Sequence, residues 1–418
     1  MSLLRSVAIE LRFAARERTL LLWAVAVFML STIAVGFGLV EVERQHKTVQ
    51  TLIKADNNDR SEVAKKLEDW GSAAYYNFHL TYDPPSDLAF AAMGLRDIHP
   101  WKHRIRMLAL EGQIYERDVA NPSVALIGRF DFAFLAAFVL PFVLIMLLYD
   151  LRVGERVAGR HDLLEVTVGR SLVFWGARAI ARVLAVFVSL ILPLVVAGIV
   201  AGVPPFKLLF VTAMVFVYLC FWATICFWAA SWRKAGSVIL MTLIFVWVLL
   251  SVILPALGRT AIDHLVPIPA GAEILMLQRE TVNDAWDLPR SLTMDEFFDR
   301  HPDWVGYERV SGSFEWQWYY AFQQVGDQRV EGLSNAYRHG VMRRAQLSRW
   351  FSLLAPPALI ENLLQALADT DLGSAMEYQE SVRAYHATLR SFYYPKFFLH
   401  EPFDKSLLQN IPKYEPRH

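Results

Sequence analysis

Five long apolar runs are the feature that most limits what this chain can fold into. They cover residues 19–40, 130–149, 180–203, 206–228 and 236–257. Each is about as long as the roughly 20 residues that a helix needs to cross a bilayer. A core helix of a soluble protein normally keeps one polar face, which these runs largely lack. We therefore expect five transmembrane helices.

The composition agrees with a membrane protein. Of the 418 residues, 55% are hydrophobic and only 20% are charged, which is an unusually apolar balance for a soluble chain. The first run could also be a secretory signal, but its core is too long and no small-residue cleavage site follows it. We interpret it as an anchor that stays in the mature protein.

The positive charges predict the orientation of the helices. Lys and Arg concentrate in residues 1–18, 150–179 and 229–235. If each run spans once, these segments lie on one side, which the positive-inside rule makes the cytoplasm. The N-terminus is then cytoplasmic and the C-terminus extracytoplasmic. Residues 41–129 and 258–418 form two extracytoplasmic regions.

Residues 1–18 have the pattern of an amphipathic helix that lies in the cytoplasmic interface. Leu4, Val7, Leu11 and Ala15 recur at helical spacing, and charged residues occupy most of the other positions. A frayed cytosolic tail is the alternative.

Both extracytoplasmic regions are expected to be largely helical. Residues 51–82 are mostly helix formers, with apolar residues at helical spacing. Residues 356–369 carry an apolar face, but a Pro pair, Glu361 and Asp369 exclude a sixth span there. The aromatic stripe 314–322 could grip an apolar substrate or lie at the membrane surface, although core packing is the favoured interpretation. The fold class is thus an all-α polytopic membrane protein.

Several catalytic motifs are missing from the sequence. No Gly-Lys dipeptide occurs, so the chain has no phosphate-binding loop of the type GxxxxGK[ST]. HExxH, CxxC and GxSxG do not occur either. Lys+Arg and Asp+Glu balance at 41 each, which gives no bias toward nucleic acid. We expect no catalytic residue and no bound cofactor in this chain.

A few polar residues remain as weak candidates for a site. Asp131 enters the second run, and an intramembrane carboxylate is a functional candidate by default, although Arg129 or water could satisfy it. Cys220 and Cys226 are expected to pack as apolar residues rather than to form a disulfide. Histidines in the external regions could assemble a metal site, but without tight spacing they are usually ordinary surface residues. These histidines are His99, His103, His301, His339, His386 and His400.

The segment between the second and third runs carries the most specific pattern. It reads YDLRVGERVAGRHDLLEVTVGR, residues 149–170. The order Tyr-Asp, Gly-Glu-Arg, Gly and Leu-Leu resembles the second-to-third loop of type-2 ABC export permeases, the ABC-2 superfamily. Where many relatives have a Pro-containing turn, this chain has TVGRS. The matching residues are Tyr149, Asp150, Gly154, Glu155, Arg156, Gly159, Leu163 and Leu164.

The resemblance extends over most of the chain. Asn121 and Pro122, the stretch 128–150 and the stretch 354–386 resemble a subgroup with two large external insertions, usually described only as a domain of unknown function. Relatives usually have six spans, and we expect this chain to lack the sixth.

The resemblance implies a permease subunit in the bacterial inner membrane. Two permeases, as a homo- or heterodimer, would pair with two copies of a separate ABC ATPase, which binds the ATP. The loop would be a coupling helix that docks on the ATPase. The residues that would mediate this contact are Glu155, Arg156, Gly159, Leu163 and Leu164.

Two other function classes remain open. The chain could be a non-transporting membrane anchor or assembly protein whose external regions bind a periplasmic partner. An intramembrane enzyme would need paired catalytic groups inside the spans, and the sequence suggests none.

Overall fold

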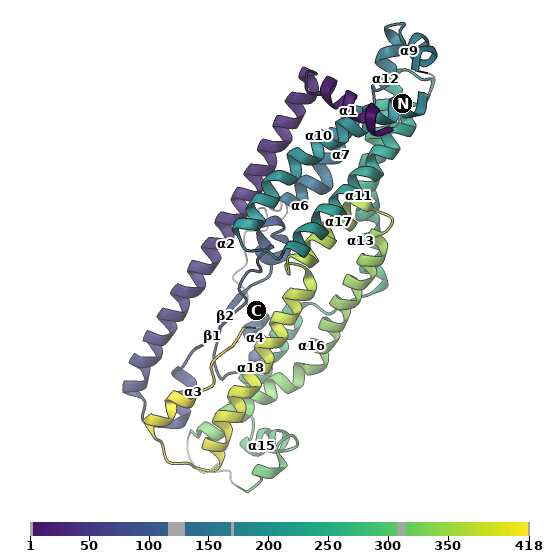
Figure 1. Cartoon of the computed structure of the whole chain (residues 1–418). Helices are drawn as coiled ribbons and strands as arrows, with labels where there is room; N and C mark the ends of the chain where they lie inside the picture. Colours follow the sequence, from purple (N-terminus) through teal and green to yellow (C-terminus); the bar gives the residue numbers. More distant parts are fainter. Residues whose placement is uncertain (1–2, 116–129, 169–170, 307–313, 417–418) are drawn as a thin grey trace.

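The computed structural model describes residues 3–115, 130–168, 171–306 and 314–416. These residues form an elongated and almost entirely helical molecule (Figure 1). The helices are α1 (Leu3–Ala14), α2 (Arg18–Lys66), α3 (Trp70–Tyr76), α4 (Leu110–Tyr115), α6 (Phe132–Phe134), α7 (Leu140–Leu148), α8 (Val153–Val157), α9 (His161–Val168), α10 (Ser171–Val200), α11 (Pro205–Ala230), α12 (Gly236–Val248), α13 (Leu254–Leu265), α14 (Gly271–Asp284), α15 (Arg290–Phe298), α16 (Trp316–Ser352), α17 (Pro356–Leu367) and α18 (Leu372–Phe398). Two π-helical turns, η3 (Leu135–Val139) and η4 (Leu249–Ile253), join α6 to α7 and α12 to α13. The 3₁₀ helices are η1 (Ala89–Ala91), η2 (Gly94–Asp97), η5 (Pro302–Trp304) and η6 (Lys405–Asn410), and the strands are β1 (His79–Tyr82) and β2 (Lys102–Ile105).

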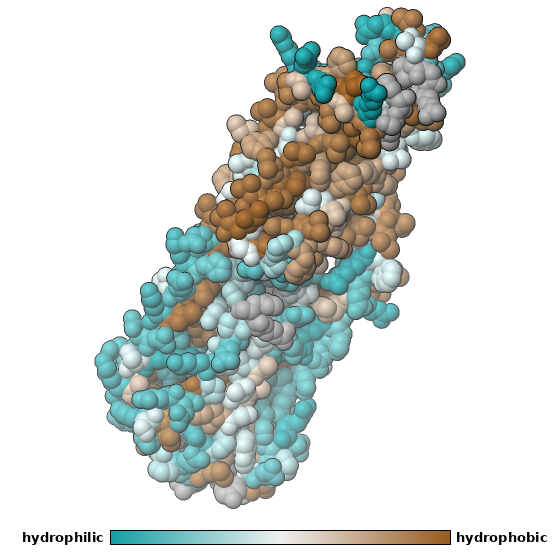
Figure 2. Space-filling model, in the orientation of Figure 1, coloured by the Kyte–Doolittle hydropathy of each residue, from teal (hydrophilic) through white to brown (hydrophobic). Residues whose placement is uncertain are grey.

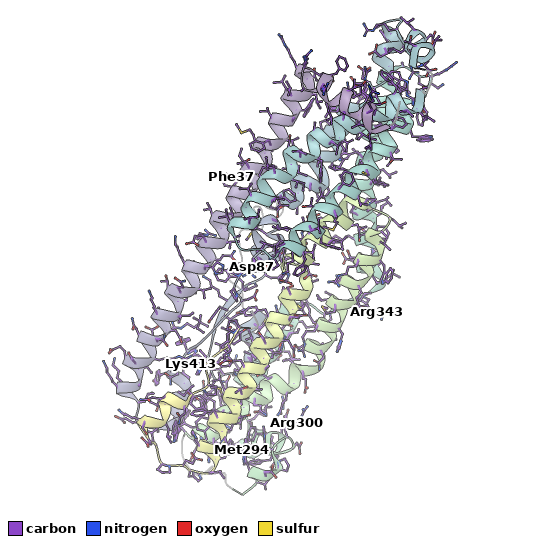
Figure 3. The ribbon with its side chains drawn as sticks, in the orientation of Figure 1. Phe37, Asp87, Met294, Arg300, Arg343 and Lys413 are labelled. Atoms are coloured by element: carbon purple, nitrogen blue, oxygen red, sulfur yellow. The ribbon has the colours of Figure 1, made fainter. Side chains whose placement is uncertain are left out.

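Five helices are long and apolar enough to cross a membrane, which confirms the five predicted candidates. They are Arg18–Lys66, Phe132–Val157, Ser171–Val200, Pro205–Ala230 and Gly236–Leu265. Figure 2 shows an apolar surface over this part of the molecule and polar surface at both ends. Phe37 lies in the apolar part, whereas Arg300 and Lys413 lie in the polar part (Figure 3).

The first candidate span belongs to a much longer helix than the apolar run predicts. Helix α2 has 49 residues, which corresponds to roughly 75 Å, more than twice the thickness of a hydrocarbon core. Its membrane half is joined to α10 by the Ser31 hydroxyl, which donates to Leu190 O at 2.7 Å. Farther along, a Cβ at Gly38 would lie 1.9 Å from Phe90 O, so only glycine allows η1 to approach α2 this closely. Helix α2 therefore runs without interruption from the first candidate span to Lys66, beside η1.

Proline explains the π-helical turn in the second span. Pro141 has no N–H, so it cannot donate to the carbonyl four residues earlier, Ala137 O. The hydroxyl of Tyr218 donates to Ala137 O at 2.6 Å, and Trp247 Nε1 donates to Phe138 O at 3.1 Å. Side chains from α11 and α12 thus satisfy carbonyls that the irregular turn exposes, as an apolar environment requires.

The two regions predicted to be external share one core. Aromatic residues from α3, α16 and α18 pack together there. Tyr320 stacks on Phe397 with ring centroids 4.8 Å apart, and its hydroxyl donates to Gly71 O at 2.9 Å. Trp318, Tyr320 and Phe322 are all buried, which confirms the core-packing interpretation for these residues of the aromatic stripe, whereas Phe314 is 44% exposed. We call this unit, residues 67–115 and 271–416, the distal body.

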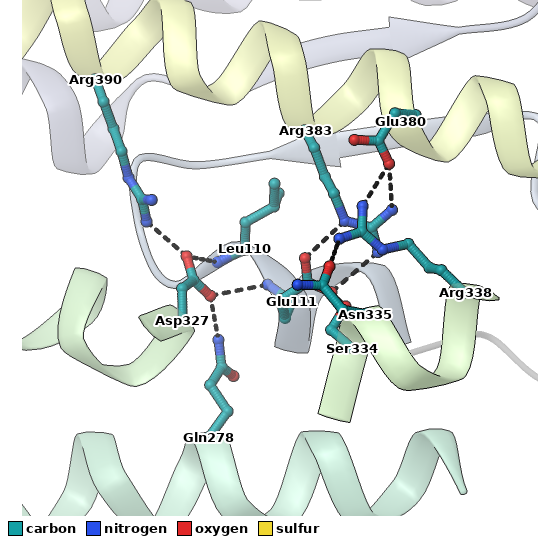
Figure 4. Close-up of polar contacts among 10 residues, drawn as sticks. All are labelled: Leu110, Glu111, Gln278, Asp327, Ser334, Asn335, Arg338, Glu380, Arg383 and Arg390. Carbon is teal, nitrogen blue, oxygen red and sulfur yellow. Dashed lines mark hydrogen bonds and ion pairs between the residues drawn. The ribbon is translucent and has the colours of Figure 1, made fainter. Parts of the chain in front are cut away.

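A buried ion-pair network joins α4, α16 and α18 within the distal body (Figure 4). Asp327 accepts from the backbone N–H groups of Leu110 and Glu111 at 2.9 and 3.0 Å and from Arg390 at 2.5 Å. Arg383 donates twice to the Glu111 carboxylate, at 2.6 and 3.0 Å. The network therefore connects residues more than 200 positions apart.

The distal body also contains a short sheet that the sequence did not predict. Strands β1 and β2 pair antiparallel, with His79 opposite Ile105 and Tyr82 opposite Lys102. Within the described residues the sheet has only these two strands. The prediction of a largely helical region is correct for α3 and α4 but wrong for these eight residues.

Candidate functional site

Three polar segments meet at one end of the helix bundle, which we call the proximal end. They are α1, residues 149–168 and the turn 231–235, and Figure 1 shows them gathered around the start of α10 and α12. Arg178 Nε lies 3.5 Å from Glu10 Oε2, and Arg182 Nη2 lies 3.0 Å from Glu17 Oε1. The first contact ties α1 to α10, and the second ties the start of α2 to α10. Residues 1–2 lie outside the described part.

The predicted coupling segment consists of two short helices, α8 and α9, and then continues into α10. Helix α10 begins at Ser171, so residues 171–179, predicted as part of the segment, already belong to the third span. Arg178 is therefore a helical residue with a fixed direction. Gly169 and Arg170 of the TVGRS turn lie outside the described residues.

Arg156 anchors the segment to the end of another span. Its Nη1 donates to Trp232 O at 2.6 Å and its Nη2 donates to Ala230 O at 3.0 Å. The last carbonyls of a helix have no partner within the helix, and a cation near them is also favoured by the helix dipole. Arg156 thus caps α11 and holds α8 against it.

Glu155 anchors the same segment on its other side. Its carboxylate lies 2.8 Å from Arg160 Nε and 3.2 Å from Arg178 Nη1. The pair with Arg160 is local, whereas the pair with Arg178 joins α8 to α10. Glu155 and Arg156, the two charged residues of the Gly-Glu-Arg motif, therefore both bind groups of this same chain.

Gly159 makes the turn between α8 and α9. Its φ of +68° lies in the left-handed region, where a side chain is strained and glycine is not. His161 begins α9 and stacks on Trp175 of α10, with centroids 5.6 Å apart. The turn and the stack together fix the direction of α9.

The Leu-Leu pair is divided between two environments. Leu164 is partly buried and packs against the core of the bundle. Leu163 is 69% exposed, and the nearby Val157 and Val166 are each 84% exposed. The segment is thus held by Glu155, Arg156 and Leu164 and presents three apolar side chains that no described residue covers.

Asp131 lies at the opposite end of the bundle, where its carboxylate accepts hydrogen bonds from backbone N–H groups. Its Oδ1 accepts from the N–H of Phe134 at 2.8 Å, which caps α6. Its Oδ2 accepts from the N–H of Met93 at 3.0 Å. Each oxygen of the Asp131 carboxylate therefore has a backbone N–H partner. Arg129, the partner considered from the sequence, lies outside the described residues.

A second carboxylate near Asp131 was not identified from the sequence. Burial, with the negative charge of Asp131 as a smaller cause, raises the pKa of Glu361 to about 7. Glu361 lies on α17, which is not one of the five candidate spans. However, Ile360, Leu364 and Ala368 of this segment belong to the core of the bundle. The amphipathic pattern of 356–369 was a usable signal, but it did not reveal what the apolar face covers.

The loop between β1 and β2, which contains η1, also closes this end of the bundle. Residues 88–93 are almost completely buried and belong largely to the same core as the spans. Ser86 Oγ donates to Ala368 O at 2.6 Å, and Thr370 Oγ1 donates to Ala92 O at 2.9 Å. The loop and α17 therefore form one lid over the bundle, fastened by Asp131.

The remaining candidates show no assembled chemical site. Among the described residues no group of three or more His, Cys, Asp or Glu side chains is placed to hold a metal ion. His386 is buried, with Nε2 3.1 Å from Arg106 O, and burial keeps its pKa well below the usual range. Cys220 and Cys226 are free thiols, as expected.

Comparison with known proteins gives one family match. The model of a domain of unknown function, DUF3526, matches residues 272–417. This range begins in α14 and covers most of the distal body, including α17 and its Glu361. No curated protein and no solved structure matches the chain. The match lies outside the segment 149–168 and supplies no activity for it.

Proposed function

We propose that this chain is a membrane-spanning permease subunit of an ABC transporter. It couples ATP hydrolysis on a separate nucleotide-binding subunit to export or to movement of its periplasmic parts. The observation that carries this proposal is the α8–α9 segment, which is anchored to two spans by Arg156 and Glu155 and exposes Val157, Leu163 and Val166. An anchored segment with an uncovered apolar face suits transmission of a partner's motion to the spans.

The orientation is part of the proposal. The proximal end carries the arginines of α1, α8 and α10, so the positive-inside rule makes it cytoplasmic. The N-terminus is then cytoplasmic, the distal body periplasmic and the membrane the bacterial inner membrane. Cysteines replacing Asp59 and Arg300 should react with an impermeant thiol reagent in intact cells, whereas one replacing Arg160 should react only after permeabilisation. Labelling of position 160 from outside would overturn this orientation.

The resemblance of residues 149–164 to type-2 ABC export permeases supports the same assignment. It suggests a second permease chain, identical or related, beside this one, and ATP bound only by the ATPase. The sequence has no loop of the type GxxxxGK[ST] that could cradle a nucleotide phosphate.

The alternative is a non-transporting anchor or assembly protein. The distal body favours it, because this body contains more residues than the five apolar runs together and offers a large surface to a periplasmic protein. In that case the apolar residues of α8 and α9 would have no ATPase partner.

Affinity purification from the native membrane separates the two functions. A nucleotide-binding ATPase should be recovered with the wild-type chain, and Leu163→Asp together with Val166→Asp should reduce its recovery about tenfold or more, since interface anchors contribute about 2 kcal/mol. Ala235→Asp, which places the same charge at an exposed N-cap position of the proximal end, is the matched control and should leave recovery unchanged. Recovery of a periplasmic protein without any ATPase would favour the anchor function.

A further inference from the structure

A cavity of about 310 Å³ lies among α13, α16, α17 and the start of α18. Helix α13 is the distal end of the fifth candidate span, and the apolar face of α17 belongs to the core of the bundle. The cavity therefore lies where the apolar surface of the spans gives way to the polar distal body.

One wall of the cavity is apolar. It includes Pro255, Ile262 and Phe351. A Cβ at Gly258 would lie 2.3 Å from the Phe351 ring, so glycine at this position lets the ring pack against α13. The contact between α13 and α16 therefore shapes this wall.

The segments that line the cavity also carry exposed apolar side chains on their outer surface. They are Leu257, Trp350, Leu353 and Leu354, which are between 56 and 72% exposed. Trp is enriched at membrane–water interfaces, where its ring is apolar and its N–H is hydrated. The segments around the cavity thus provide apolar surface suited to lipid chains.

The other wall carries three arginines and two aspartates. Arg344 Nη1 lies 2.7 Å from Asp263 Oδ1, and Arg349 Nη2 lies 2.6 Å from Asp371 Oδ2. Arg259 is bound more loosely, because its Nε lies 4.0 Å from Asp263 Oδ2 and its side chain is 88% exposed. One positive charge is therefore in excess, and Arg259 carries it at the mouth of the cavity.

We propose that this cavity binds an anionic phospholipid of the outer leaflet. The head-group phosphate binds Arg259 and the exposed part of Arg349, and an acyl chain lies along Leu257, Leu353 and Leu354. A zwitterionic lipid carries a second, positive group that the excess charge disfavours, and a soluble phosphate cannot use the apolar surface. This inference rests on the membrane spans and, for the choice of the outer leaflet, on the proposed orientation; it does not need the ATPase.

Native mass spectrometry of the full chain tests the inference. Protein purified in detergent is titrated with phosphatidylglycerol and with phosphatidylcholine of the same chains. The wild type should retain phosphatidylglycerol preferentially, and Arg259→Gln with Arg349→Gln should weaken this binding about fivefold for each arginine removed. Arg343→Gln, an exposed arginine of α16 that does not line the cavity, is the control and should bind as the wild type does.

Three outcomes would overturn the inference. They are equal retention of phosphatidylcholine by the wild type, unchanged phosphatidylglycerol binding in the double variant, and displacement of the lipid by millimolar inorganic phosphate. The last would indicate a site for a soluble anion. Arg259 is too exposed for its substitution to threaten folding, and a thermal melt of each variant checks this.

Discussion

The two polar ends of the bundle use their arginines in different ways. In the distal body, the side chains of Arg383 and Arg390 are only 11 and 21% exposed and are held by Glu111 and Asp327. At the proximal end, Arg156 binds backbone carbonyls and Glu155 binds arginines that are partly exposed. Most aromatic residues of α16 and α18 are packed in the core of the distal body, whereas Val157, Leu163 and Val166 of the proximal end are 69–84% exposed. The two ends therefore differ in how their charged groups are held and in which short segment carries exposed apolar side chains.

Breaking the Glu111–Arg383 pair should produce the largest effect. Glu111→Ala removes the close carboxylate of the largely buried Arg383 and leaves, among the described residues, only the exposed Glu380 carboxylate, at 3.5 Å; breaking a buried pair in this way typically costs about 3–5 kcal/mol. The thermal midpoint of the purified protein should therefore fall by several degrees or more. Glu43→Ala, which removes the exposed pair with Lys47, is the control and should cost less than about 1 kcal/mol. Equal shifts would mean that the distal body does not depend on the network.

The next largest effect should be a pH dependence caused by Glu361. Its folded pKa of about 7 is above the ordinary value, so its contribution to stability is present at low pH and is lost as the pH rises from about 4.5 to 7. Glu361→Gln should remove this dependence and stabilise the protein at pH 8 by on the order of 2–3 kcal/mol. Parallel melts of wild type and variant between pH 5 and 8 check the sign. A wild type that becomes more stable over this range, with the variant unchanged, would contradict it.

The sequence predicts features set by neighbouring residues better than features set by contacts between distant residues. The five candidate spans follow from local apolar runs. The Gly-Glu-Arg motif and Gly159 coincide with a turn and with the contacts that hold α8 to α10 and α11. Helix was expected from residue 51, but its continuity with the first run was missed, because residues beyond 40 are largely polar and contact the segment 83–98, which the sequence does not place. Strands of four residues are too short to give a pattern of their own.

The candidate site was predicted in part. Residues Glu155, Arg156, Gly159, Leu163 and Leu164 do lie together, but the sequence could not divide them into anchors and exposed residues. That division depends on Ala230, Trp232 and Arg178, which come from other helices. The relation between Asp131 and Glu361, 230 residues apart, is likewise set only by the packing of α17.

The turn at Gly159 should give a smaller effect. Gly159→Val places a β-branched residue at a positive φ, which costs about 1–2 kcal/mol. Because this strain is local, tryptic cleavage between α8 and α9 should accelerate while the global thermal midpoint stays nearly constant. Gly176→Ala in α10, where a Cβ meets nothing within 4 Å, should leave the cleavage rate unchanged. Unaltered cleavage in both variants would show that the turn tolerates any residue.

The two leucines should give the smallest and most discriminating difference in the isolated chain. Leu163→Ala should change the free energy of unfolding by less than about 0.5 kcal/mol because the side chain is exposed. Leu164→Ala should cost about 1 kcal/mol or more because its side chain packs on the bundle. Urea or thermal unfolding of the purified variants measures both. The reverse order would mean that the exposed and packed faces of α9 are assigned wrongly.

Cross-linking from position 163 in living cells tests the central claim most directly. A photoreactive amino acid replaces Leu163, and the same amino acid at Leu4 serves as the control. We expect position 163, and not position 4, to form an adduct with a protein that contains a GxxxxGK[ST] loop. No such adduct at position 163, or identical adducts at both positions, would contradict the claim that α8 and α9 dock on an ATPase.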